Sequence, residues 1–232
     1  MTKRPIQLDP RNPYANEAAT ESRIRESGHR KVVGGMWEEV GQLQRSFLIS
    51  QGLSPKSMML DVGCGALRGG IHFVDYLNAG NYFGIDNNQP LMDAGFEIEL
   101  PKVGLQEKLP RSNLFCCRDF DARGFGVSFD FALAQSVFTH IPLSEIKLAL
   151  SSLSPVMKPG GKFFATFFNT GDADAAGRLR HVPGGIETFP DKNPFHQSIS
   201  QWCDKMNEND WSFHLIGDWG LGASSCAENG AL

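Results

Sequence analysis

Short apolar runs alternate with helical patterns over residues 58–168, and this alternation constrains the fold more than any other feature. The runs that we expect to be strands are Met58–Val62, Tyr82–Ile85, Leu114–Cys117, Phe129–Ala134 and Lys162–Phe168. Apolar residues at helical spacing occupy the intervals 67–77, 89–99 and 143–153. Strands that are joined through helices run parallel, and helices then cover both faces of their sheet. The sequence therefore predicts a doubly wound α/β fold with a mostly parallel sheet.

The regions on either side of this pattern have different character. Residues 1–35 are mostly polar, and we expect them to form an N-terminal arm with one short helix near residues 15–27. The arm ends at Gly34-Gly35, which could serve as the hinge of a lid. Residues 36–232 are expected to form one domain that starts with an amphipathic helix. Within it, residues 169–198 are irregular and rich in Gly and Pro, which favours an acceptor-side functional segment.

Composition excludes several classes of protein. The net charge is −4 and no block of lysines and arginines occurs, so nucleic acid is not an expected partner. No apolar segment is long enough to cross a bilayer and no signal peptide is recognisable, so we expect a cytoplasmic protein. The five cysteines form no C-x-x-C pair and are expected to be free thiols. The six histidines are scattered, and we predict no metal site.

A glycine-rich turn, LDVGCGALRGG, follows the first expected strand. Gly63 and Gly65 allow backbone angles and close approaches that a side chain would prevent, which indicates a bound small molecule. A dinucleotide fingerprint would have its third glycine where Arg68 stands. Asp86 ends the second expected strand, where a carboxylate can accept both hydroxyls of a ribose. The aspartate alone suits a dinucleotide or another nucleoside.

Five motifs, taken together, carry a resemblance to a known family. They are LDVGCG (60–65), GID (84–86), RDFD (118–121), FDFALAQSVFTHIP (129–142) and KPGGKFF (158–164). In this order they resemble the class I S-adenosylmethionine-dependent methyltransferases, over about residues 56–170. The resemblance implies a Rossmann-like domain, S-adenosylmethionine as the cofactor and methyl transfer as the activity.

The resemblance also implies roles for individual residues. Gly63 and Gly65 would line the amino-acid end of the cofactor, and Asp61 would organise their loop. Asp86 would hold the ribose. Arg68 could pair with the cofactor's carboxylate or be solvated.

Further roles concern the adenine and the methionine portion. Asn87 would lie against the adenine ring, and Asp119 or the backbone of Phe120 would meet its amino group. Gln135 would lie near the methionine portion. In this family a reversed hairpin usually ends the sheet, and Trp211–Ile216 could be one arm of it. Because residues 221–232 are poor strand formers, we expect the final antiparallel strand to be missing or altered.

Methyl transfer from a sulfonium needs alignment more than a catalytic triad. His140, after the fourth expected strand, is the first candidate for a general base, and His196 is the second. The family's motif for base amino groups and its Pro-Cys nucleophile are both absent. We therefore expect a small-molecule acceptor, with a protein side chain as the alternative. Two other functions stay open: a nicotinamide-dependent oxidoreductase or epimerase, and a binding protein without chemistry. The oligomeric state is not predicted.

Overall fold

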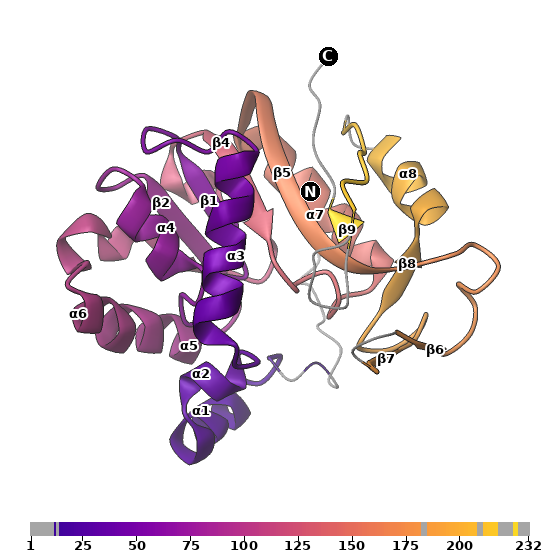
Figure 1. The fold of residues 1–232 in the computed structure, drawn as a ribbon, viewed down its shortest axis with the longest axis horizontal. Coiled ribbons are helices and arrows are strands. Elements are labelled where there is room, and N and C mark those ends of the chain that lie inside the picture. The colour runs from indigo at the N-terminus through magenta and orange to yellow at the C-terminus, as the bar shows by residue number, and fades with distance from the viewer. Residues whose placement is uncertain (1–11, 13, 182–184, 208–210, 218–224, 227–232) are drawn as a thin grey trace. The chain divides into compact units, whose positions relative to one another are not determined.

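The chain forms two compact units, and Figure 1 labels their helices and strands. The computed structural model describes residues 12, 14–181, 185–207, 211–217 and 225–226. One unit spans residues 13–118, and the other combines residues 119–232 with residues 1–12. The division at residue 35 that the sequence suggested stays a prediction. None of the helices in the described ranges is long and apolar enough to cross a membrane.

The unit of residues 13–118 is built from three parallel strands and the helices between them. Its elements are α1 (Glu17–Ser27), α2 (His29–Val32), α3 (Trp37–Ser50), β1 (Met59–Val62), α4 (Gly70–Tyr76), β2 (Tyr82–Asp86), α5 (Gln89–Ala94), the π-helical turn η1 (Gly95–Glu99), α6 (Leu100–Val103) and β3 (Leu114–Cys116). Strand β2 pairs with β1 on one side and with β3 on the other. The register places Val62 beside Ile85, and Asp86 beside Cys116, so the carboxyl ends of the three strands meet at one edge.

Gly84 of β2 lies so close to the glycine turn that only a hydrogen atom fits. A Cβ there would lie 2.9 Å from Cys64 Sγ and 2.9 Å from Leu114 Cδ2. Because both neighbours are buried, we expect Gly84→Ala to lower the free energy of unfolding by about 1–3 kcal/mol, as overpacking does. Urea denaturation measures this. Gly124→Ala is the control, because a Cβ there meets nothing within 4 Å in the described part of the chain; equal stability of both variants would contradict the close packing.

The other unit also alternates strands with helices. Its elements are β4 (Phe129–Ala134), α7 (Leu143–Leu153), β5 (Met157–Thr170), β6 (Leu179–Arg180), β7 (Glu187–Thr188), β8 (His196–Ser198), α8 (Ile199–Asn207) and β9 (Ser225–Cys226). Strand β5 lies parallel to β4 and to β8, and β9 pairs antiparallel with β5. A reciprocal cap begins α8: Ser198 N–H donates to Gln201 Oε1 at 2.9 Å, and Gln201 N–H donates to Ser198 Oγ at 3.4 Å.

The acceptor-side segment 169–198 is less irregular than its composition suggested. It contains the two-stranded antiparallel pair of β6 with β7, and it ends in β8. Figure 1 shows this pair below β8 and α8. The segment is therefore a folded extension of β5.

The short helix that we expected near residues 15–27 is confirmed as α1, and the described part of the arm adds a second helix, α2; the two bury Thr20 and His29. Two other expectations about secondary structure were wrong. Helix α4 begins at Gly70 and not at Leu67, because Leu67 has a left-handed φ of 64°. The strand that we expected over Lys162–Phe168 is longer, because β5 spans Met157–Thr170 and includes the residues KPGG.

The end of the chain also differs from the expectation. Trp211–Ile216 forms no strand in the described residues. Trp211 instead packs in the core, where its ring contacts Phe163. The Nε1 of Trp211 donates a hydrogen bond to Leu150 O at 3.2 Å. The final antiparallel strand is altered but present, because β9 lies within the segment that looked poor in strand formers.

Candidate functional site

The glycine turn uses its own N–H groups inside the fold. Gly63 and Gly65 have left-handed φ angles of 76° and 51°. The N–H groups of Gly63 and Cys64 both donate to Ile85 O, at 2.8 and 3.1 Å, and Gly65 N–H donates to Asp86 Oδ2 at 2.7 Å. A phosphate needs N–H donors at such a turn. Because these three are already engaged, the turn suits a ligand that donates hydrogen bonds to its carbonyl oxygens.

Asp86 is a partly exposed carboxylate at the end of β2. Besides the bond from Gly65, its Oδ1 accepts a hydrogen bond from Asn88 N–H at 2.8 Å. Burial raises the pKa of Asp86 to about 6, although the backbone N–H groups of Gly65 and Asn88 act in the opposite direction. Each carboxylate oxygen can accept more than one hydrogen bond. Asp86 can therefore hold the turn and still accept hydrogen bonds from a ligand's hydroxyl groups.

Asp61 lies behind the turn and not on its surface. The residue is buried, and Tyr82 Oη donates to its Oδ2 at 2.7 Å. Burial raises the pKa of Asp61 and the hydrogen bond from Tyr82 lowers it, and the net result is a pKa of about 7. Tyr82 leaves no room at Gly70, where a Cβ would lie 2.5 Å from Oη. This arrangement fits the predicted organising role of Asp61, because the bond ties β1 to β2 beneath the turn.

Residues 28–36, here named the cap segment, pack against the glycine turn. A Cβ on Gly65 would lie 3.4 Å from Val33 Cγ1. Arg68 Nη1 donates to Val33 O at 2.9 Å and to Gly35 O at 3.0 Å. Neither interpretation of Arg68 from the sequence included these partners, through which its guanidinium links the cap segment to the turn. The pairing of Arg68 with a cofactor's carboxylate stays a prediction.

Substitution of Arg68 tests this link. Arg68→Met removes both donors and leaves two partly buried carbonyl groups unpaired, so we expect the Kd for S-adenosylhomocysteine to rise about tenfold, or about 1.4 kcal/mol. Titration calorimetry measures it. Arg45→Met is the control, because Arg45 makes a longer 3.4 Å pair with the exposed Asp75 on the surface. If both variants bind S-adenosylhomocysteine with equal affinity, the cap segment does not contribute to cofactor binding.

Tyr14 is a neighbour of the site that sequence reasoning missed. Its hydroxyl donates to Val32 O at 3.2 Å. Burial raises the pKa of Tyr14, while the charges of Arg23 and Arg68 lower it and the charge of Asp86 raises it. The one available signal was an aromatic residue within an otherwise polar arm.

The two asparagines that follow Asp86 have different surroundings. Asn88 is buried and begins α5, where its Oδ1 accepts a hydrogen bond from Leu91 N–H at 3.3 Å. Its Nδ2 donates to Thr20 Oγ1 at 3.0 Å and so ties α5 to α1. Asn87 is partly exposed beside Asp86. Asn88 is therefore structural, and Asn87 is accessible for the predicted place against an adenine.

Asp119 and Phe120 belong to the unit of residues 119–232. Both are partly exposed, and Phe120 has a left-handed φ of 58°. Asp119 Oδ1 accepts a hydrogen bond from Asp121 N–H at 3.2 Å. A bulky residue rarely adopts this conformation, and such strain clusters at ligand sites. The observation supports the predicted role of this turn without placing a ligand there.

A second strained loop follows β4. Ser136 has a φ of 60°, and its N–H donates to Thr166 Oγ1 at 2.7 Å. Gln135 Nε2 donates to Ser136 Oγ at 2.7 Å. His140 ends the loop, and its Nδ1 lies 2.7 Å from Asn193 Oδ1. The predicted residues Gln135 and His140 thus share one loop that hydrogen bonds hold in place.

His196 lies in a closed hydrogen-bond chain. The side chain is 3% exposed, with Nδ1 2.8 Å from Thr188 Oγ1 and Nε2 3.2 Å from Ala175 O. Because a carbonyl oxygen only accepts, Nε2 carries the hydrogen and Nδ1 accepts from Thr188. Both ring nitrogens are therefore engaged, which favours a structural role over that of a base.

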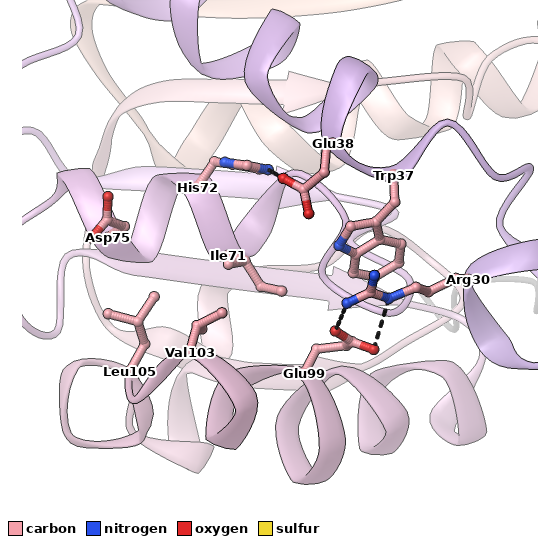
Figure 2. A pocket seen from close by; sticks show the side chains of 9 residues that line it. All are labelled: Arg30, Trp37, Glu38, Ile71, His72, Asp75, Glu99, Val103 and Leu105. Carbon is pink, nitrogen blue, oxygen red and sulfur yellow. Dashed lines mark hydrogen bonds and ion pairs between the residues drawn. The ribbon is translucent and has the colours of Figure 1, made fainter.

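A cavity of about 220 Å³ lies between α3, α4 and α6, apart from the glycine turn. Figure 2 shows Arg30 and Glu99 on one side of it and His72 paired with Glu38 on another, 3.6 Å apart. Glu99 accepts from Arg30 at 2.5 and 3.0 Å. The lining includes none of the predicted cofactor residues, as far as the structure describes it. Because several of its charged groups pair with one another, we assign this cavity no ligand.

Comparison with known proteins finds a family match for the central region. Residues 60–165 match the family model described as a methyltransferase domain. This part of the chain is similar to a methyltransferase domain. The match includes the glycine turn, Asp86, the strained Phe120 and the loop after β4, whereas Tyr14, the cap segment and His196 lie outside it.

Solved structures share the fold of the methyltransferase domain over most of the chain. Magnesium protoporphyrin IX methyltransferase from Synechocystis PCC 6803, with bound S-adenosylhomocysteine, is 14% identical with a TM-score of 0.63, covering 93% of this chain and 99% of that one. The glycopeptide N-methyltransferase MtfA, complexed with S-adenosylmethionine, is 12% identical with a TM-score of 0.58, covering 83% and 94%. Both likenesses show a Rossmann-like α/β fold, as predicted.

The same fold also carries other chemistry. The [4+2]-cyclase SpnF is 18% identical with a TM-score of 0.56, covering 78% of this chain and 62% of that one. Fold alone therefore does not choose the reaction, which must be argued from the residues of the site.

Proposed function

We propose that this protein transfers the methyl group of S-adenosylmethionine to a small-molecule acceptor. The observation that carries the proposal is the glycine turn within a methyltransferase domain. Its three engaged N–H groups disfavour a phosphate, and the carboxylates of Asp61 and Asp86 would repel one. The same features suit a nucleoside that ends in an ammonium group. The nicotinamide alternative, whose pyrophosphate requires those N–H groups, is thereby disfavoured.

The residues present fit such a cofactor. Asp86 would accept hydrogen bonds from the ribose hydroxyls, and the carbonyl oxygens around Gly63 and Gly65 would accept from the ammonium. Asn87 and the Asp119–Phe120 turn would contact the adenine, and Gln135 the methionine portion. When bound, S-adenosylmethionine supplies an activated methyl group on a positively charged sulfur. The chain would align the acceptor and exclude water.

Small-molecule acceptors are supported by the solved neighbours, whose names include a porphyrin and a glycopeptide methyltransferase. The folded extension of residues 169–198, which carries Asn193 beside His140, is where we propose that the acceptor binds. A protein side chain is the alternative acceptor. Release of S-adenosylhomocysteine on incubation with small molecules or with peptides would separate the two.

Titration calorimetry tests the cofactor. We expect S-adenosylhomocysteine to bind with micromolar affinity and NADH not to bind, because the N–H groups of Gly63, Cys64 and Gly65 already donate hydrogen bonds within the fold. Absence of heat with millimolar S-adenosylhomocysteine would overturn the proposal. Binding without turnover of any acceptor, small molecule or peptide, would instead indicate a cofactor-binding protein or chemistry other than methyl transfer.

A further inference from the structure

Two amide side chains lie side by side at the end of β5. Asn169 of β5 pairs in register with Gln197 of β8. In the part of the chain that the structure describes, Asn169 Oδ1 and Gln197 Oε1 are both buried and neither has a hydrogen-bond partner. Gln197 is 3% exposed, whereas Asn169 is partly exposed. A buried carbonyl oxygen without a donor costs free energy, so two of them together indicate a place for another molecule.

Trp202 brings an unpaired donor to the same face of the sheet. Its Nε1 is also buried and without a hydrogen-bond partner among the described residues. Its ring centre lies 4.7 Å from that of Phe167, and Phe167 and Asn169 are alternate residues of β5. Alternate residues of a strand point to one face, and the register places Gln197 on that face too. Because neighbouring strands are about 4.8 Å apart and alternate residues about 6.6 Å, one small molecule can reach all three groups.

The opposite face of the same strands is closed by its own contacts. Phe168 pairs in register with His196, and its ring centre lies 4.8 Å from that of His181. Both histidines share a hydrogen bond with the Thr188 hydroxyl, and the other ring nitrogen of His196 contacts Ala175 O. The two faces therefore differ at this end of the sheet, because the unpaired amide oxygens point away from the histidines.

The three unpaired groups define the chemistry of a ligand. The two amide oxygens accept hydrogen bonds and the indole N–H donates one. A group that complements them donates two hydrogen bonds and accepts one, as a primary carboxamide does. None of the three side chains carries a charge, and a buried ion without a counter-charge is costly. The rings of Phe167 and Phe213, at 4.7 and 6.0 Å from that of Trp202, favour a flat aromatic body.

The geometry points to a subsite in which Asn169, Gln197 and Trp202 bind the neutral, carboxamide-like edge of an aromatic methyl acceptor. Both amides belong to the acceptor-side segment and lie at the carboxyl end of β5, the end at which doubly wound sheets bind ligands. The partly exposed Asn169 gives the subsite its access to solvent. The inference rests on the proposed function only in naming the ligand as the acceptor. The subsite selects the acceptor, and another atom of that molecule receives the methyl group.

Nitrogen–proton NMR of the full chain with benzamide tests the subsite without any cofactor. The indole signal of Trp202, assigned by its absence in Trp202→Phe, should move downfield as benzamide accepts its hydrogen bond. Acetophenone lacks the N–H donors and benzoate is charged, so both should bind at least about tenfold more weakly. Gln197→Met should raise the Kd for benzamide about tenfold. A wild-type signal that ignores benzamide, or that responds equally to all three compounds, would overturn the inference.

The stability of the free protein provides a second test. Gln197→Met removes the unpaired oxygen at similar volume, so we expect the Tm to rise by about 2–4 °C. Gln201→Met is the matched control, because Gln201 Oε1 accepts a hydrogen bond from Ser198 N–H at 2.9 Å. It should lower the Tm and leave benzamide binding unchanged. An equal or lower Tm in Gln197→Met would show that Gln197 already has a partner, such as a bound water, and would overturn the inference.

Titration with S-adenosylhomocysteine separates this inference from the proposed function. Gln197→Met should bind S-adenosylhomocysteine as tightly as the wild type. A wild-type protein that does not bind it would refute the acceptor role and leave the benzamide subsite intact. Should Trp202→Phe fail to fold, thermal unfolding with benzamide provides the decision: the ligand should raise the Tm of the wild type more than that of Gln197→Met, and equal increases would contradict the subsite.

Discussion

Replacement of Asp86 by Ala should raise the Kd for S-adenosylhomocysteine about 10- to 150-fold. Loss of a charged hydrogen-bond acceptor costs about 1.5–3 kcal/mol, and here the proposed ribose contacts and the bond from Gly65 N–H disappear together. Titration calorimetry at pH 7.5 measures the change. Asp93→Asn is the matched control, because it removes one charge from α5, where Asp93 forms a surface pair with Arg111 at 2.9 Å.

The pH dependence of binding provides a second measurement on Asp86. Burial raises its pKa to about 6 in the free protein, and ribose hydroxyls donate to the ionised form. Affinity should therefore strengthen as pH rises from about 5 to 7, by up to about tenfold per pH unit below the pKa, and then level off. In Asp86→Asn this dependence should disappear. A similar pH profile in the variant and the wild type, or an unchanged Kd in Asp86→Ala, would remove Asp86 from the ribose site.

Replacement of Glu99 by Ala should cost about 3 kcal/mol of stability. Glu99 is 0% exposed and accepts hydrogen bonds from three side chains: Arg30, Lys102 at 3.0 Å and His29 at 2.5 Å. Loss of one member of a buried ion pair costs about 3–5 kcal/mol. The low end applies because the side chains of Arg30 and Lys102 are 46% and 52% exposed and can be hydrated. Thermal unfolding should shift by about 6–12 °C.

Glu97→Ala is the control, since this exposed residue lies in the same π-helical turn, and it should change stability by less than about 0.5 kcal/mol. Burial alone would raise the pKa of Glu99, but the hydrogen bonds from Arg30, Lys102 and His29 outweigh it and lower the pKa to about 2. A depressed carboxyl pKa stabilises the fold above about pH 4.5, and this contribution is lost as pH falls toward 2. Equal stability of the Glu97 and Glu99 variants would show that the cluster is hydrated in solution.

The Glu99 cluster is also where sequence reasoning had nothing to offer. Nothing in the sequence around Glu99 distinguishes it from Glu97, two residues earlier in the same turn. Only the packing of α2 against η1 brings His29 to Glu99 across 70 residues. The interaction of Arg30 with the Trp37 ring, at 4.6 Å, belongs to the same packing. Trp37 is therefore 7% exposed and part of the core.

Local pattern alone determined strands β1 to β4, most of β5, the glycine turn and the place of Asp86. A strand that is buried on both faces needs apolar residues at consecutive positions, so a short apolar run predicts such a strand. The position of Asp86 followed from strand β2, whose end the sequence locates to one residue. Two expectations failed for local reasons. Leu67 adopts a left-handed conformation that no sequence pattern predicts, and Trp211–Ile216 buries the Trp211 ring without pairing as a strand.

Tertiary structure decided which polar residues share a partner. Arg68 reaches Val33 across 35 residues, and His140 reaches Asn193 across 53. Residues 87 and 88 are both asparagines, yet only Asn88 is buried, between α1 and α5. Such contacts depend on where the backbone returns after long separations, and a side chain's hydrogen-bonding capacity does not specify its partner. The sequence thus predicted where a site would lie, and the tertiary structure determined which residues form hydrogen bonds around it.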